Sequence, residues 1–331
     1  MEDIRQRPRR NRQSAVVRAL FRETSLTVDH LIYPLFLESK PLLKTEISSM
    51  PGIYRWGEEV LLKEIEKCVA LGIRAFVLFP AVPDELKDSS ASYSWDKNNF
   101  YLKAIRRIKQ HFPEVWLVSD VAMDPYSSDG HDGWVEDGKI INDKTLPVLG
   151  QMAVAQADAG IDMIGPSDMM DGRVGYLRTV LDQAGFQQTG ILSYTAKYAS
   201  AFYGPFRDAL DSAPKSGDKK TYQMDYANRK EAIRELRLDE QEGADMVMVK
   251  PAWSYLDVIA EVKAHSTLPV AAYNVSGEYA MIKAAAANGW VDGTQAMEEM
   301  LVSIRRAGAD VILTYFAPEY AALIQNRSKY I

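Results

Sequence analysis

The stretch Glu-Gly-Ala-Asp-Met-Val-Met-Val-Lys, residues 242–250, decides the fold class, because it closes one element and completes the next. The residues before it follow a helical pattern, and Gly243 can adopt the left-handed conformation that ends a helix. The apolar run after Asp245 predicts a short buried strand, which ends at Lys250 and Pro251. A strand that follows a helix so directly is typical of parallel α/β sheets.

Three more junctions repeat this helix–glycine–strand order, at Gly72, Gly160 and Gly308. Short apolar runs alternate with helical patterns, and eight of these runs are candidate strands: Leu31–Leu37, Ala75–Phe79, Val115–Val121, Asp162–Gly165, Gly190–Thr195, Asp245–Val249, Val270–Val275 and Val311–Tyr315. This alternation predicts an α/β fold, a (β/α)8 TIM barrel. We assign the barrel to residues 26–331 and an extended N-terminal arm, which makes oligomer contacts, to residues 1–25.

The composition of the 331 residues, 47% hydrophobic and 25% charged, is that of a soluble globular protein. No apolar run is long enough for a transmembrane helix, so we expect no membrane partner. The single cysteine, Cys68, excludes an internal disulfide and a cysteine-rich zinc cluster. No secretory signal is visible, and we therefore expect a cytoplasmic protein. The motifs of nucleotide-binding proteins, serine hydrolases and zinc peptidases do not occur, and no organic cofactor is expected.

Charge is unevenly distributed, because residues 1–22 hold seven arginines against Glu2 and Asp3 although the chain has a formal net charge of −6. A basic start of this kind could bind nucleic acid, act as a transit peptide or dock on an acidic neighbouring subunit. A targeting peptide normally avoids acidic residues at its start, whereas this one holds Glu2 and Asp3. No aromatic stacking platform alternates with the arginines, and the rest of the chain is acidic. We therefore expect a homo-oligomer and no nucleic-acid partner.

Two lysines follow neighbouring candidate strands. Lys250 ends the strand at 245–249, and Lys197 follows the strand at 190–195. Neighbouring strands lie about 4.8 Å apart, so both amines should enter one cavity at the carboxyl ends of the strands. Burial and the charge of the other lysine both lower a lysine pKa and leave more nucleophilic free amine. Two such amines predict a condensation of two carbonyl substrates held as Schiff bases, although either lysine alone also fits a structural ion pair.

Two long polar loops follow strands and should cover the catalytic end of the barrel. One spans 124–143, and the other includes 214–220. Cationic residues suited to a substrate carboxylate lie in the segment of the second loop: Arg207, Lys219 and Lys220. Hydroxyls suited to a second carboxylate lie at two further strand ends: Ser276 and Tyr315. Ser276 fits equally well as the N-cap of a helix over 277–287.

The aspartates of the first loop allow more than one interpretation. Clustered carboxylates without soft ligands favour a hard cation such as Mg²⁺, or hydrogen bonds to a substrate amine. A turn without metal is the alternative, since the spacing from Asp124 does not match an EF-hand. No histidine triad accompanies His131, which we expect to face solvent.

Seven segments in a fixed order carry a family resemblance: Tyr33–Phe36, Ser119–Val121, Gly165–Arg173, Ser193–Tyr198, Met248–Pro251, Val275–Tyr279 and Leu313–Phe316. On these segments the chain resembles the porphobilinogen synthase (5-aminolevulinate dehydratase) family, from near Arg5 to about Arg327. The resemblance implies that two molecules of 5-aminolevulinate condense to porphobilinogen, with loss of two waters, in tetrapyrrole (haem and chlorophyll) biosynthesis.

The resemblance also implies residue roles. Lys250 would form the Schiff base of the propionate-side (P) site, and Lys197 that of the acetate-side (A) site. The P-site carboxylate would be bound by Ser276 and Tyr315. The A-site carboxylate would be bound by Arg207, Gln223 and one of Lys219 and Lys220. The remaining substrate-binding residues would be Tyr273 and Phe202 as apolar walls, together with Asp120, Ser167, Asp124 and Asp132.

Zinc-dependent members of the family carry three cysteines where this chain has Ala122, Asp124 and Asp132. No zinc is therefore expected, and the chain resembles the aspartate-rich, magnesium-responsive members. Asp124 and Asp132 would bind a cation or the A-site amino group directly. A glutamate implied to bind a structural or allosteric Mg²⁺ at a subunit interface corresponds to Glu235, which also fits a solvated helix face. For the arm, the resemblance implies that it wraps a neighbouring barrel and supports a homo-octamer, alongside smaller assemblies.

A class I aldolase is the alternative function on the same fold, because it also uses a lysine imine. Aldolases need one such lysine and a phosphate-binding pair of loops. No glycine-rich phosphate loop follows the seventh or eighth candidate strand. The pair of lysines therefore favours the condensing enzyme.

Overall fold

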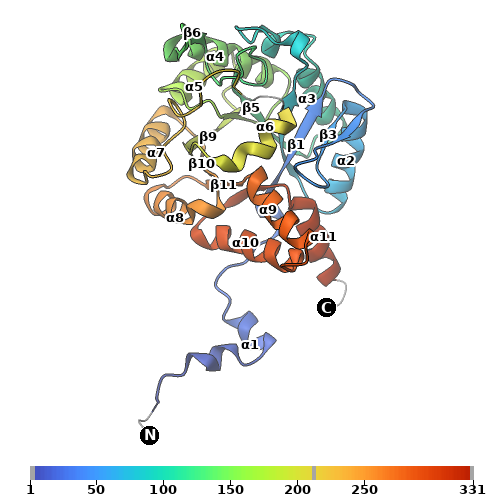
Figure 1. Cartoon of the computed structure of the whole chain (residues 1–331), viewed down its shortest axis with the longest axis vertical. Helices are drawn as coiled ribbons and strands as arrows, with labels where there is room; N and C mark the ends of the chain where they lie inside the picture. The colour runs from blue at the N-terminus through green and yellow to red at the C-terminus, as the bar shows by residue number, and fades with distance from the viewer. Residues whose placement is uncertain (1–3, 211–213, 329–331) are drawn as a thin grey trace.

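A closed barrel of parallel strands forms the centre of the computed structural model, which describes residues 4–210 and 214–328 (Figure 1). Its strands are β1 (Leu31–Glu38), β4 (Ala75–Ala81), β5 (Trp116–Val121), β8 (Met163–Pro166), β9 (Gly190–Lys197), β10 (Met246–Lys250), β11 (Val270–Asn274) and β12 (Val311–Thr314). Each pairs in parallel with the next, and β12 pairs with β1. The predicted (β/α)8 barrel is confirmed, and each candidate strand matches an observed one within two residues.

Helices surround this barrel (Figure 1). They are α2 (Glu58–Ala70), α3 (Phe100–His111), α4 (Asn142–Asp158), α5 (Arg173–Gln183), α6 (Gly204–Leu210), α7 (Lys230–Glu242), α8 (Leu256–His265), α9 (Ser276–Ala287), α10 (Gly293–Ala307) and α11 (Ala317–Ser328). Short 3-10 helices cover Pro8–Arg12, Val28–His30, Asp84–Leu86, Ser92–Trp95, Ala201–Tyr203 and Trp253–Tyr255. In Figure 1, α6 crosses the mouth of the barrel.

Glycine ends the four helices that were expected to end that way. Gly72, Gly160, Gly243 and Gly308 all have positive φ, between 93° and 123°, and lie one or two residues after the ends of α2, α4, α7 and α10. This conformation strains a side-chain-bearing residue but not glycine. The turns return the chain to the amino ends of the strands, which leaves the carboxyl ends free to carry the site.

Aromatic rings fill the barrel near the carboxyl ends of its strands. Phe36 of β1 contacts Phe79 of β4, Phe206 of α6 and Tyr315 after β12, with ring centroids 5.6–5.9 Å apart. Phe36, Phe79 and Tyr315 are buried. Burying one such side chain contributes about 1.5–3 kcal/mol to folding. These packed rings fill the barrel interior at the end where the reactive side chains lie.

Two hairpins were not predicted. One consists of β2 (Lys44–Glu46) and β3 (Tyr54–Trp56), which extends the sheet beside β1. The other consists of β6 (Val135–Glu136) and β7 (Lys139–Ile140) inside the loop after β5. Both are too short for a period-of-two pattern to identify them in the sequence.

The N-terminal segment stands apart from the barrel. Figure 1 shows the 3-10 helix at Pro8–Arg12 and α1 (Ala15–Leu20) beyond α10 and α11. Large apolar side chains of this segment are exposed: Ile4, Val16, Leu20 and Phe21. The outer ends of the two assigned regions, 1–3 and 329–331, lie outside the described residues. No helix in the described part is both long and apolar enough to span a membrane.

Candidate active site

Lys250 and Lys197 end adjacent strands and stand opposite each other in the register of β10 and β9. The register shifts between them, because Val247 pairs with Ser193 but Val249 pairs with Ala196. One extra residue on β9 therefore forms a bulge.

This bulge turns Lys197 into the barrel. Ser193 points outward, since its hydroxyl donates to Asp239 of α7 at 2.5 Å. Strict alternation would place Lys197 on that same outer face. The extra residue reverses the alternation, and Lys197 instead reaches residues at the mouth of the barrel. The sequence spacing alone does not reveal this reversal.

Lys250 is surrounded by aromatic rings. Its Nζ lies 4.6 Å from the ring centre of Tyr273 and 5.0–5.1 Å from those of Tyr194, Tyr203 and Phe206. Burial, and next the charge of Lys197, lower the pKa of Lys250 to about 7. A large fraction of this amine is therefore unprotonated near neutral pH, as a nucleophile requires.

Lys197 is held by oxygen atoms. Its Nζ donates to the backbone carbonyl of Ser167 and lies 3.4 Å from Asp132 Oδ2. The Ser167 hydroxyl donates to Asp120 Oδ1 at 2.7 Å. Burial and the charge of Asp124 raise the pKa of Asp120 to about 7. Asp120 can therefore release or take up a proton near neutrality.

Lys219 separates the two candidate metal-binding aspartates. Its Nζ lies 3.0 Å from Asp124 Oδ2 and 2.7 Å from Asp132 Oδ1. Burial, and next the charge of Asp132, raise the pKa of Asp124. Burial acts the same way on Asp132, but Lys197 and Lys219 together hold the pKa of Asp132 far below its usual value. Lys220 lies outside this cluster, with its side chain 73% exposed beside Asp218.

The residues expected at the P site are linked to Lys250 through Tyr273, whose ring centre lies 4.6 Å from Lys250 Nζ. The hydroxyls of Tyr273 and Tyr315 are 3.0 Å apart, and both side chains are buried. Ser276 is the first residue of α9 and not its N-cap, so the N-cap alternative is wrong. Its Oγ accepts a hydrogen bond from the backbone N–H of Phe206 at 3.0 Å and thereby ties α9 to α6.

The residues expected to bind the A-site carboxylate lie on the segment between β9 and α7. Arg207 is half-buried on α6, and Phe202 is half-buried in the turn before it. Gln223 is buried, and its Oε1 has no hydrogen-bond partner. A buried unpaired amide oxygen is costly unless a ligand satisfies it.

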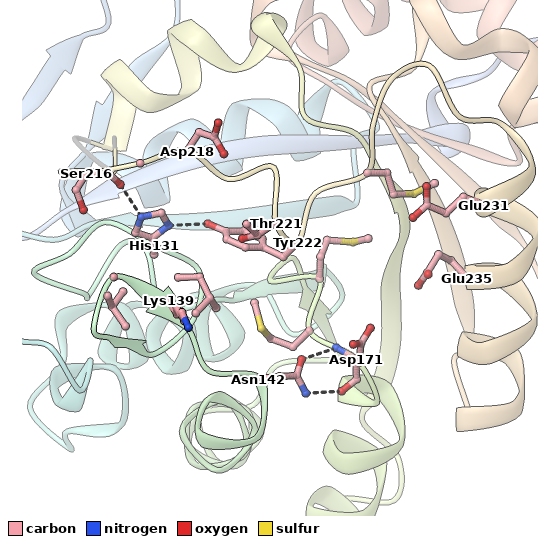
Figure 2. A pocket seen from close by; sticks show the side chains of 17 residues that line it. His131, Lys139, Asn142, Asp171, Ser216, Asp218, Thr221, Tyr222, Glu231 and Glu235 are labelled. Atoms are coloured by element: carbon pink, nitrogen blue, oxygen red, sulfur yellow. Dashed lines mark hydrogen bonds between the residues drawn. The ribbon is translucent and has the colours of Figure 1, made fainter.

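His131 does not face solvent as expected. It is buried, its Nδ1 lies 3.1 Å from the Tyr222 hydroxyl, and its Nε2 lies 2.8 Å from the Ser216 carbonyl oxygen (Figure 2). The imidazole thus joins the loop after β5 to the segment that carries Lys219. The segment folds over the loop, a long-range contact that the sequence around His131 does not encode.

Glu235 lies on α7 at a cavity of about 910 Å³ that Glu231, Asp171 and Lys139 also line (Figure 2). Burial raises the pKa of Glu235, with smaller contributions from Asp171 and Glu231, while Arg173 opposes them. In the described part of the chain, no three His, Cys, Asp or Glu side chains are placed to hold one metal ion. Glu235 is therefore a partly buried carboxylate beside other acids, not a complete metal site.

Together, the fold and this site define a (β/α)8-barrel enzyme with two lysine amines at the ends of adjacent strands. The family model described as delta-aminolevulinic acid dehydratase matches residues 5–323. The chain belongs to the delta-aminolevulinic acid dehydratase family. This membership supports the condensing enzyme over the aldolase alternative.

Individual relatives agree over nearly the whole chain. The dehydratase of Chlamydia pneumoniae is 50% identical over 323 residues, which are 98% of this chain and 97% of the relative. The chloroplastic dehydratase of Physcomitrium patens is 55% identical over 317 residues, 95% of this chain and 73% of the relative. A Toxoplasma gondii dehydratase, solved in complex with the reaction product porphobilinogen, is 52% identical with a TM-score of 0.95, covering 97% of this chain and 92% of that one.

Proposed function

We propose that this chain condenses two molecules of 5-aminolevulinate to porphobilinogen, with loss of two waters, through Schiff bases on Lys250 and Lys197. The observation that carries the proposal is the alignment of the two buried lysines across β9 and β10, with both amines near the ring of Tyr194. Family membership supplies the substrate and the product. The pathway is tetrapyrrole biosynthesis.

Each lysine would take up one substrate. The free amine adds to the ketone carbon, and the carbinolamine loses the ketone oxygen as water to give an imine. One imine carbon then bonds to a carbon of the other substrate, and the other imine carbon bonds to an amine nitrogen; the attacking carbon and nitrogen each lose a proton. Each lysine then leaves from the carbon that has formed the new bond and takes up a proton to return as an amine. Loss of one further ring proton at each elimination completes the double bonds of the pyrrole. The two lost waters are therefore the two ketone oxygens.

Carboxylate binding would orient the two substrates. At the P site, Tyr273 faces Lys250 and its hydroxyl lies against that of Tyr315, and Ser276 and Tyr315 would bind the carboxylate. At the A site, Arg207 and the side-chain N–H group of Gln223 would donate to the carboxylate, and the unpaired Oε1 of Gln223 is open to a donor of the substrate. The contacts of Asp132 with Lys197 and Lys219 support a role for its carboxylate in receiving the substrate amine.

Activity should rise with pH through about 7, because the pKa of Lys250 is lowered to about 7 and only its free amine attacks. Below about pH 6, kcat/KM should fall about tenfold per pH unit. The measurement is the pH profile of kcat/KM for the chain and for Asp120→Asn, since Asp120 also has a pKa of about 7. If the fall of kcat/KM at low pH disappeared in Asp120→Asn, it would arise from Asp120 and not from protonation of Lys250.

Lys219 and Lys220 should differ sharply. Lys219→Met should lower kcat about 100-fold, because Asp124 and Asp132 lose the buried ammonium between them. Lys220→Met should change kcat less than about twofold, since its side chain is exposed. Steady-state assays of the two variants, with folding checked by circular dichroism, make the comparison. Equal losses in both would show that the structure assigns the wrong lysine.

For the metal, we propose that Mg²⁺ acts at Glu235 and not between Asp124 and Asp132. Glu235 would bind the ion directly, and Glu231 and Asp171, which line the same cavity, would reach it through the waters that Mg²⁺ keeps. Asp124 and Asp132 fit it less well, because Lys219 already neutralises them. Magnesium at Glu235 would stabilise packing around α7 and act as a structural or allosteric ion. No zinc is proposed.

For assembly and location, we propose a homo-octamer in the cytoplasm. Val16, Leu20 and Phe21 of the arm are exposed, and burying them against another copy would remove apolar surface from water. The arginines of the arm complement the acidic remainder of the chain. Sedimentation with and without Mg²⁺, set beside activity, tests whether the metal acts through assembly.

The test of the proposed function is porphobilinogen formation from 5-aminolevulinate after exhaustive chelation, followed by addition of Mg²⁺ or Zn²⁺. We expect product formation to rise with Mg²⁺ and to ignore Zn²⁺. Full activity without metal would contradict the proposal that Mg²⁺ activates the enzyme but not the proposed condensation. No product under any condition would overturn the condensation itself.

A further inference from the structure

A buried arginine behind the site contacts both structures that place Lys197. Arg173, at the start of α5, is buried and lies outside the barrel wall. One of its Nη atoms donates to the backbone carbonyl oxygen of Tyr194 and to Ser193 Oγ, each at 3.2 Å. Tyr194 directly follows Ser193 in the bulge of β9. Arg173 therefore holds the bulge that turns Lys197 inward.

The second structure is the turn after β8. This turn carries Ser167, whose backbone carbonyl accepts the hydrogen bond from Lys197 Nζ. Arg173 reaches it through the carbonyl oxygen of Met170 at 3.4 Å and through Met169 Sδ at 3.7 Å. The turn also contains Asp168, whose Oδ2 lies 3.9 Å from Arg173 Nε. The same guanidinium thus spans from the bulge to the turn that carries the Ser167 carbonyl.

The turn is in a conformation that needs such support. Met169 has a φ of 63°, in the left-handed region that side-chain-bearing residues rarely adopt. Asp168 stabilises it locally, because Asp168 Oδ1 accepts a hydrogen bond from the backbone N–H of Met170 at 2.8 Å. Asp168 is itself fully buried, and its Oδ2 has no hydrogen-bond partner. A buried carboxylate of this kind depends on a nearby cation, and Arg173 is that cation.

The charge on Arg173 is matched on its other side as well. Arg173 Nη lies 3.6 Å from Asp239 Oδ1, and Asp239 accepts the hydroxyl hydrogen of Ser193. A planar guanidinium can serve these separate acceptors at once, whereas an ammonium is a single point charge. The geometry therefore requires arginine and not only a positive charge.

We propose that Arg173 is a positioning residue for Lys197, which sets the direction of its amine by fixing the β9 bulge and the Ser167 carbonyl together. The inference rests on the proposed function, in which Lys197 forms the A-site imine. Arg173 touches the wall around Lys250 through Tyr194, whose backbone carbonyl it holds and whose ring lies 5.1 Å from Lys250 Nζ. It touches the surroundings of Lys197 through both the β9 bulge and the turn after β8, so its effect should fall mainly on Lys197. A residue that merely stabilised the fold would affect both lysines equally.

The experiment is reductive trapping of 5-aminolevulinate with borohydride, followed by digestion and mass spectrometry of the Lys197 and Lys250 peptides. Arg173→Lys keeps the positive charge but loses the planar guanidinium that donates to several acceptors at once. We expect it to lower trapping at Lys197 about tenfold or more and to leave trapping at Lys250 within about twofold. Asp168→Asn, which keeps the acceptor for Met170, should lower trapping at Lys197 less and in the same selective way.

Arg178→Lys is the matched control. Arg178 lies on the same helix, and its guanidinium donates to the carbonyl oxygens of Thr189 and Phe186 before β9, away from the bulge. Selective loss at Lys197 in Arg173→Lys, absent in Arg178→Lys, supports the proposal. Equal loss at both lysines, or the same result in both arginine variants, overturns it while the condensation stands. If the unaltered chain makes no porphobilinogen and traps at neither lysine, the proposed function fails instead.

Discussion

Lys250→Met should lower the rate of porphobilinogen formation at least about 10⁴-fold, since removing a covalent nucleophile removes its whole reaction path. Methionine keeps much of the volume of lysine, so the aromatic rings around position 250 should remain packed. The measurement is the single-turnover rate at saturating 5-aminolevulinate, with thermal unfolding as the control for folding.

The variant should also lose its borohydride-trapped adduct at the Lys250 peptide. A folded Lys250→Met protein that kept more than about 1% of the rate would contradict the assigned covalent role. The result would then place the first imine elsewhere.

Lys197→Met should lower product formation about 1,000-fold or more and leave one substrate bound as an imine on Lys250. The charge of Lys197 is among the causes that lower the pKa of Lys250. Without that charge the pKa of Lys250 rises above about 7, and less free amine is present at neutral pH. Trapping at Lys250 should therefore persist but shift to higher pH.

The measurement is the rate of adduct formation at Lys250 between about pH 6 and 9 in the chain and in Lys197→Met. Coincident pH profiles would show that the two amines do not interact electrostatically. Normal porphobilinogen formation by the variant would exclude Lys197 from the chemistry.

The barrel and its two lysines were predictable because both depend on local sequence patterns. Each strand is a short apolar run, and each of the four helix-ending glycines has the conformation that its position predicts. A lysine at the end of an apolar run lies at the catalytic end of a barrel by topology alone. Its facing is a separate matter, because the bulge that turns Lys197 inward is not visible in the sequence spacing.

The rest of the site depends on contacts between distant segments. Lys219 and Lys220 are neighbours in sequence, and only the fold of the segment decides that Lys219 enters the site. His131 was expected at the surface, but residues 216–222 cover it. Arg173 stands in one of the segments that carry the family resemblance, yet no spacing indicates that it contacts the β9 bulge.

Because of the bulge in β9, whether the second amine points into the barrel depends on the number of residues in the strand more than on which side chains it carries. Successive side chains of a strand point to opposite faces. One residue more or less before position 197 therefore decides whether its lysine points into the barrel or against the surrounding helices. A β9 shorter by one residue would keep Ser193, Lys197 and every other side chain of the site, and would still present only Lys250 to the cavity. A barrel that uses one amine and a barrel that uses two can thus differ by a single inserted residue, with no new chemical group required.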